Sequence, residues 1–163
     1  MRLRAAGPGD AGAVAAIWNP MIRDTAVTFN SAPKTVEGLR AQFAACAAEG
    51  RPFLLAEETG GAVVGFATYG RFRAGPGYAH TMEHTVIVSQ QAHGHGVGRA
   101  LMAALCEHAR AAEVHSLIAA VSAENPGAVA FHEAQGFARV ARLPQVGRKF
   151  GRWMDLVLLQ KFL

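Results

Sequence analysis

The chain has 163 residues, of which 51% are hydrophobic and 17% charged; this length and composition are typical of one globular domain and exclude a disordered protein. The net charge of +4 could suit nucleic acid, but Lys and Arg are scattered without a basic run, and a protein that binds an anionic ligand fits the charge equally well; we expect no nucleic-acid partner. No stretch is apolar enough to span a membrane, and "MRLRAAGPGD" lacks the apolar core of a signal peptide, so we expect a cytoplasmic protein with no membrane contact.

The first part of the chain alternates β-prone and helical segments. The pattern predicts a strand over 2–6, a helix over 10–22 that Pro20 disturbs, a β-prone stretch over 25–30, a helix over 35–48 and a hairpin of strands 53–58 and 62–70. Cys46 and Cys106 lack CxxC spacing and fall on the apolar faces of helices, which predicts buried free thiols.

The second part repeats the order strand then helix. A Gly/Pro-rich loop over 71–80 is followed by expected strands at 82–89, 116–122, 138–143 and 152–162, with helices at 97–112 and from Pro126 to Gly136. The wholly apolar run 86–88 predicts a strand that is buried on both faces. With no linker or repeat, the chain reads as one α+β domain, 1–163, around a mixed sheet.

The most informative stretch is "QQAHGHGVGRALM", residues 90–102, where glycines precede an expected helix. A strand that runs into a glycine-rich turn and a helix presents unpaired backbone amides and a positive dipole end, a suitable binding site for phosphate. The spacing does not fit a P-loop, which needs Gly-Lys-Ser/Thr, or the dinucleotide fingerprint GxGxxG. A purely structural turn is the alternative.

"HGHGVGRALM" resembles the acyl-CoA loop of the GCN5-related N-acetyltransferases (GNAT), whose pattern is Arg/Gln-x-x-Gly-x-Gly/Ala after a buried strand. In this register Gly96 and Gly98 match the family glycines. His93 stands where the family usually has Arg or Gln, so side-chain contact with a pyrophosphate is weaker here or depends on pH.

Four further stretches, "IWNPMIRDTAVTF", "EHTVIV", "ENPGAVAFHEAQGF" and "VGRKFGRWMDLVLLQ", resemble the phosphinothricin and methionine sulfoximine acetyltransferase branch over nearly the full length. The resemblance implies a three-layer fold with a central mixed, mostly antiparallel sheet flanked by helices, and acetyl-CoA as co-substrate. The implied cofactor contacts are Val86, Ile87, Val88, His93, Gly94, His95, Gly96, Val97, Gly98, Arg99 and Asn125. For Asn125, helix capping alone is the alternative.

Two residues are candidates for proton transfer. Glu83 lies at the start of the strand that would accompany the pantetheine arm, and the resemblance implies that it is the general base, because an ammonium substrate must lose a proton before it attacks a thioester. His132 lies four residues before Gly136, where many relatives have Tyr and this branch has His; it could protonate the leaving thiolate or relay protons. A solvated carboxylate and a structural histidine remain open as alternatives.

Substrate recognition needs a cation for the carboxylate of an amino acid. Arg73 falls where the branch places a substrate-loop Arg, and the expected pocket wall consists of Phe72, Arg73, Glu83, His84 and Thr85, with Thr28 and Phe29 as further candidates. No metal site is expected, because on a strand His80 and His84 would lie more than about 12 Å apart.

Together these features predict direct transfer of acetyl from acetyl-CoA to the α-amino group of a small amino acid or analogue such as phosphinothricin, methionine sulfoximine or methionine sulfone. Acetylation of a protein amine and a non-catalytic CoA-binding sensor are the alternatives. The resemblance also implies a homodimer, with "VGRKFGRWMD" as a candidate interface segment. The sequence leaves the physiological amino acid undetermined.

Overall fold

Seven strands form one sheet in the computed structural model, which describes residues 1–163. They are β1 (Arg2–Ala5), β2 (Phe53–Glu57), β3 (Val63–Arg71), β4 (Thr81–Val88), β5 (Ser116–Ser122), β6 (Ala138–Lys149) and β7 (Arg152–Phe162). Their order is β1-β2-β3-β4-β5-β7-β6, and only the β4–β5 pair is parallel. The expected mixed, mostly antiparallel sheet is therefore confirmed.

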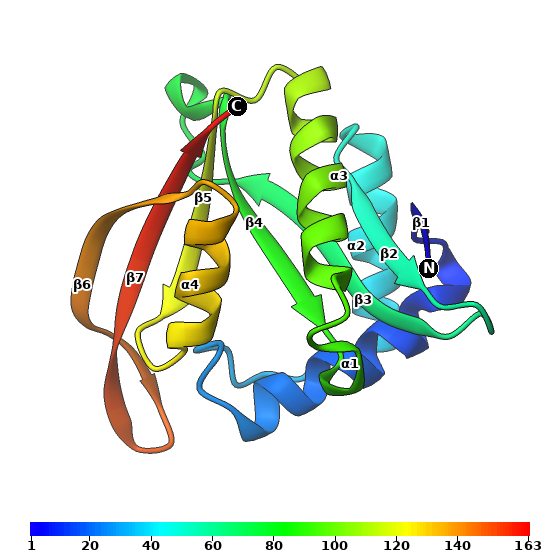
Figure 1. Cartoon of the computed structure of the whole chain (residues 1–163), viewed down its shortest axis with the longest axis horizontal. Helices are drawn as coiled ribbons and strands as arrows, with labels where there is room; N and C mark the ends of the chain where they lie inside the picture. Colours follow the sequence, from blue (N-terminus) through cyan, green and yellow to red (C-terminus); the bar gives the residue numbers. More distant parts are fainter.

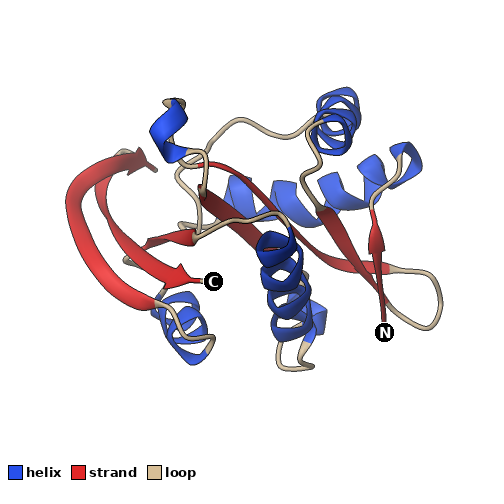
Figure 2. Ribbon diagram, turned by 90° about the horizontal axis from the view of Figure 1, so that it is seen from above, coloured by secondary structure: helices blue, strands red, loops and turns tan.

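Four helices cover the two faces of this sheet (Figures 1 and 2). They are α1 (Ala11–Asp24), α2 (Val36–Ala48), α3 (Val97–Ala111) and α4 (Pro126–Ala134), with short 3-10 turns η1 (Pro8–Asp10), η2 (Pro76–Tyr78) and η3 (Gln90–Ala92). None of the helices is long and apolar enough to cross a membrane.

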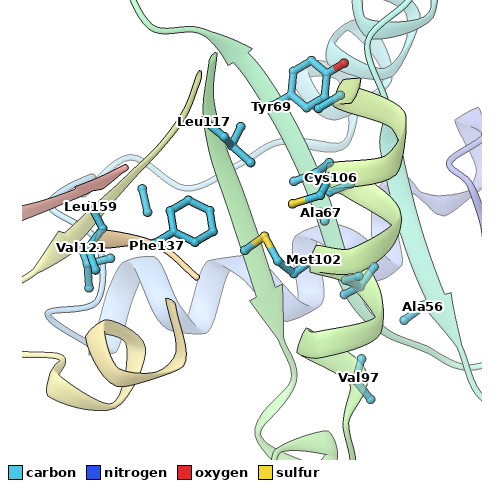
Figure 3. Close-up of a cluster of buried hydrophobic side chains, with 14 of the residues drawn as sticks. Ala56, Ala67, Tyr69, Val97, Met102, Cys106, Leu117, Val121, Phe137 and Leu159 are labelled. Carbon is cyan, nitrogen blue, oxygen red and sulfur yellow. The ribbon is translucent and has the colours of Figure 1, made fainter. Parts of the chain in front are cut away.

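Two hydrophobic clusters hold the layers together, one on each face. The smaller joins α1 and α2 to β2 and β3 and contains Cys46. The larger joins α3 and α4 to the centre of the sheet; Figure 3 shows Met102 and Cys106 of α3 together with Leu117 and Phe137 in this cluster. Both cysteines are free and buried, as the helical periodicity predicts.

The connection between the first two helices differs from expectation. Helix α1 continues through Pro20 to Asp24, because burial of residues such as Val14 and Ile22 on its inner face offsets the one backbone hydrogen bond that proline removes. Residues 25–30 form no strand, although their sequence is β-prone. Side-chain contacts hold them instead, among them hydrogen bonds from the ammonium of Lys149 to the carbonyls of Thr25 and Thr28, so that tertiary contacts outweigh the local β preference.

Strands β4 and β5 are paired only at their beginnings, from Thr81 with Ser116 to Glu83 with Ile118. Beyond Glu83 they diverge, as Figure 1 shows, while β4 stays bonded to β3 as far as Val88 and β5 stays bonded to β7. The prediction that 86–88 is buried on both faces is therefore wrong. These side chains are half-buried, because the diverging strands leave an opening beside them.

The last two strands form a long ribbon at the edge of the sheet (Figure 1). Strand β6 extends to Lys149, six residues beyond the expected 138–143, because it stays paired with β7 across irregularities near 140 and 144–146. The ribbon carries Gly147 and Lys149, which face the segment between α1 and α2.

Candidate active site

The opening between β4 and β5 is a cavity of about 410 Å³. Its walls come from α1, the segment after α1, β4, β5, α4 and β7. The lining residues are Trp18, Val27, Thr28, Phe29, Asn30, Glu83, His84, Thr85, Val86, Ile87, Ala119, Ala120, Val121, Ser122, Asn125, Ala128, His132 and Leu156. Because β4 lacks a partner on this side, its free backbone edge can accept an extended, amide-containing ligand as a further strand would be accepted.

The glycine loop lies at the end of β4. Gly94 and Gly96 both have φ of +78°, a left-handed conformation that strains other residues. Gly96 begins α3 without a side-chain cap. The backbone amides of residues 94–99 have no acceptor within the protein, so they are free to bind an anion, as the sequence predicts.

The side chains of the loop differ in their exposure to a ligand. Gly94, His95, Gly96 and Arg99 are exposed, whereas Val97 is buried in the core, which leaves only its backbone amide for a ligand. His93 donates from Nε2 to the carbonyl of Val88 at 3.0 Å. Its imidazole is therefore bonded to the end of β4.

Asn125 is the N-cap of α4, and its Oδ1 accepts from the amide of Ala128 at 3.1 Å. This confirms the capping role. Asn125 also lines the cavity, so its amide NH₂ remains available to a ligand.

Glu83 lies on β4 where the β4–β5 pairing ends. Although its side chain is accessible from the cavity, the surrounding walls remove enough water to raise the pKa of its carboxyl, and the positive charge of Arg73 opposes this rise. A carboxylate with a raised pKa is a better proton acceptor.

His132 faces the cavity from α4 and is 7% exposed. Its Nδ1 lies 2.7 Å from the carbonyl of Ala128; because a carbonyl only accepts, we assign the hydrogen to Nδ1 and a free lone pair to Nε2. Burial lowers the pKa of His132, and its Nε2 has no partner in the protein. Its ring is thus neutral at neutral pH, with a buried Nε2 that carries a free lone pair.

His84 lines the cavity, as expected, although only 7% of the residue is exposed. Its ring packs against those of His132 and Phe137, at centroid distances of 5.0 and 5.5 Å, and neither of its nitrogens has a partner. Burial lowers its pKa to about 3. Phe72 and Arg73 do not line the cavity, so the structure does not bring them together with His84 as one wall; Arg73 lies instead over the ring of Phe72 and influences Glu83 by charge.

The segment after α1 supplies a wall that the sequence predicted only through Thr28 and Phe29. Val27 and Asn30 complete it, and Trp18 of α1 lies in the same cavity lining. Lys149, which no sequence pattern singles out, is buried beneath this segment and bonds to its backbone. No group of three or more potential metal ligands occurs in the structure.

The sequence matches the family model described as "Acetyltransferase (GNAT) family" over residues 18–137. It is 38% identical to the L-methionine sulfoximine/L-methionine sulfone acetyltransferase of Pseudomonas paraeruginosa, over 97% of this chain and 92% of that protein. It is similar to a crystal structure described as ribosomal-protein-alanine N-acetyltransferase from Brucella melitensis, with a TM-score of 0.96, 40% identity and all of both chains covered. It is also similar to yncA from Salmonella typhimurium, solved with its cofactor acetyl-CoA, with a TM-score of 0.96, 35% identity and 100% and 94% of the two chains covered.

The family match and these relatives show the class of protein: an acyl-CoA-dependent acetyltransferase. The chain belongs to the GNAT family and is an N-acetyltransferase. Its similarity to the methionine sulfoximine and phosphinothricin branch is also confirmed.

Proposed function

We propose that this protein transfers acetyl from acetyl-CoA to the α-amino group of a small amino acid or analogue of the methionine sulfoximine, methionine sulfone or phosphinothricin type. One observation carries the proposal: Glu83 and His132 line the same cavity, which extends along β4 as far as Ile87, and the loop of free amides at residues 94–99 follows the end of β4 in the chain. The names of the related enzymes support the substrate class.

The residues present fit acetyl-CoA. The free amides of 94–99 would hold its pyrophosphate, and the unpaired edge of β4 at 86–88 would bind the pantetheine arm. The amide of Asn125 would add a contact from the opposite side of the cleft. The co-substrate supplies the thioester, whose carbonyl carbon the amine attacks.

Glu83 removes the proton that makes the amino acid an ammonium ion, directly or through one water. The raised pKa of its carboxyl favours this step, while Arg73 keeps it ionised. The amine then bonds to the acetyl carbon and the carbon–sulfur bond breaks. Nε2 of His132 accepts a proton from the amine and returns it to the thiolate, a relay that its free lone pair supports.

The test measures release of thiol from acetyl-CoA with natural amino acids, phosphinothricin, methionine sulfoximine and methionine sulfone in competition, with Glu83→Gln alongside. We expect turnover of at least one of these compounds and strong loss in the variant. Unchanged turnover in Glu83→Gln would remove this residue from its role. Acetyl-CoA binding without turnover of any amine would favour a sensor.

Acetylation of a protein N-terminus is the second candidate, supported by the description of the Brucella relative as an alanine N-acetyltransferase of a ribosomal protein. The same α-amine would then belong to a peptide. Competition between free alanine and an alanine-initiated peptide distinguishes the two: preferred acetylation of free alanine supports the first candidate, and preferred acetylation of the peptide supports the second.

We further propose a homodimer through the β6–β7 ribbon. Val146, Phe150 and Trp153 in this ribbon are each more than half exposed, at 52%, 55% and 59%, and apolar residues gathered on one edge are typical of an interface. Light scattering should give a dimer that Trp153→Glu converts to a monomer; a monomeric wild-type protein would contradict this.

A cytoplasmic location completes the proposal. Both cysteines are free thiols, as is usual in a reducing compartment. Fractionation of cells that produce the protein tests this.

A further inference from the structure

The segment between α1 and α2 has little main-chain support. No backbone–backbone hydrogen bond involves residues 26–34. Local turns, such as the amide of Asn30 donating to Oγ1 of Thr28, shape it internally, and Asn19 fixes its far end by two hydrogen bonds with Lys34. The position of residues 25–30 over the cavity therefore depends on contacts with other elements.

Lys149 of β6 supplies the strongest of these contacts. Its side chain is buried, at 6% exposed, and its ammonium donates to the carbonyls of Thr25 at 2.6 Å and Thr28 at 2.9 Å. Burial lowers the pKa of the amine, and no carboxylate forms an ion pair with it. Hydrogen bonds from a buried cation are stronger than those between neutral groups.

Gly147, two residues earlier on the same strand, supplies a second contact. A Cβ at this position would lie 2.2 Å from Cδ2 of Phe29, well inside contact distance. The ring of Phe29 therefore packs on bare backbone, and only glycine permits that approach. Neither Gly147 nor Lys149 lines the cavity, whereas Thr28 and Phe29 do.

We propose that Lys149 and Gly147 are positioning residues that fix residues 25–30 as the cavity wall that selects the side chain of the substrate. Lys149 sets the position of the backbone, and Gly147 sets the depth to which Phe29 enters. This inference rests on the proposed function, because it assigns the wall to the amino-acid side chain. The glycine loop that would hold acetyl-CoA touches neither residue.

The first test compares Lys149→Met, which keeps the aliphatic stem and removes the donors, with Lys149→Arg, which keeps a positively charged donor group. Lys161→Met is the matched control, because Lys161 also donates to a backbone carbonyl, that of Gln135 at 2.6 Å, away from the segment. We expect KM for the amino acid to rise about ten-fold or more in Lys149→Met. In the same variant, KM for acetyl-CoA should stay within about two-fold of the wild-type value. Lys149→Arg should reverse most of the rise in KM for the amino acid. Lys161→Met should have the wild-type KM for both substrates.

The second test does not depend on activity. Chymotrypsin cleaves after exposed aromatic residues, so we would measure the rate of cleavage after Phe29 by mass spectrometry in the ligand-free protein, with the melting temperature as a check on folding. Lys149→Met should be cleaved several-fold faster than wild type, Lys149→Arg and Lys161→Met.

The third test is a double-mutant cycle. Gly147→Ala should raise KM for the amino acid about ten-fold in the wild-type background but by less than about two-fold in the background of Phe29→Ala, where the obstructing ring is absent. Equal effects of Gly147→Ala in both backgrounds would overturn the assigned role of Gly147.

The outcomes separate the two proposals. If wild type acetylates no amino acid, the proposed function fails, and the proteolysis result alone then decides whether Lys149 positions residues 25–30. If Lys149→Met has a wild-type KM for the amino acid and wild-type cleavage after Phe29, the positioning role of Lys149 is overturned and the proposed function stands.

Discussion

The imidazole rings of His84 and His132 lie with their centroids 5.0 Å apart, one from β4 and one from α4. Both are buried, and burial lowers the pKa of each. His84 has no hydrogen-bond partner on either nitrogen. The pair is therefore neutral at neutral pH, and a charge placed on one ring penalises a charge on the other.

Because burial lowers the pKa of His84, we expect the free energy of unfolding to fall in mild acid. The unfolded chain protonates His84 near its ordinary pKa of 6.5, whereas the folded chain does so only near 3. Unfolding therefore takes up a proton between these values, and stability falls as pH drops through that window. Between pH 7 and 5 we expect His84 to account for about 2 kcal/mol of lost unfolding free energy.

Urea unfolding of the ligand-free protein at both pH values measures this effect. His84→Phe should lose less stability than wild type on acidification, while His95→Phe, in the exposed loop, serves as the control. An equal loss in wild type and His84→Phe would contradict the assignment.

Replacement of Glu83 should affect the chemical step. If Glu83 is the base, Glu83→Gln lowers kcat by about 10²- to 10⁴-fold with little change in KM for acetyl-CoA. Since burial raises the pKa of Glu83 and Arg73 opposes the rise, Arg73→Gln should move the acidic limb of the pH–rate profile to higher pH. Arg71→Gln, on a neighbouring exposed residue, is the control and should leave the limb in place.

A comparison of Gly96→Ala with Gly61→Ala distinguishes an effect on folding stability from an effect on acetyl-CoA binding, because both glycines have a left-handed backbone. Gly96 and Gly61 have φ of +78° and +83°, and an added Cβ would meet no atom within 4 Å at either position. Alanine should therefore cost about 1–2 kcal/mol of stability at both. Only Gly96→Ala should weaken acetyl-CoA binding, measured by calorimetry, because Gly61 lies in the β2–β3 turn; equal binding by both variants would exclude the loop as the pyrophosphate site.

The two roles of Asn125 can be separated by two substitutions. Asn125→Asp keeps an oxygen that caps α4, whereas Asn125→Ala loses the cap at a cost of about 1 kcal/mol. Both variants lose the amide donor. We expect both to raise KM for acetyl-CoA but only Asn125→Ala to lower the melting temperature; a wild-type KM in both would leave Asn125 as a cap alone.

Much of the fold could be predicted because its signals are local. The apolar periodicity of α2, α3 and α4 and the turn glycines of the β2–β3 hairpin each arise within one element. The differences occur where tertiary contacts outweigh local preference: α1 continues through Pro20, residues 25–30 stay irregular, and β6 runs on beside β7.

The sequence by itself determined the chemistry of the glycine loop, because the φ values of Gly94 and Gly96 and the free amides of an uncapped helix start depend only on neighbouring residues. Only the tertiary structure decided the shape of the site. The divergence of β4 from β5 opens 86–88 to the cavity, and Lys149 reaches a carbonyl 124 residues earlier in the chain. Such relationships have no sequence period, because they depend on how separate elements pack against one another.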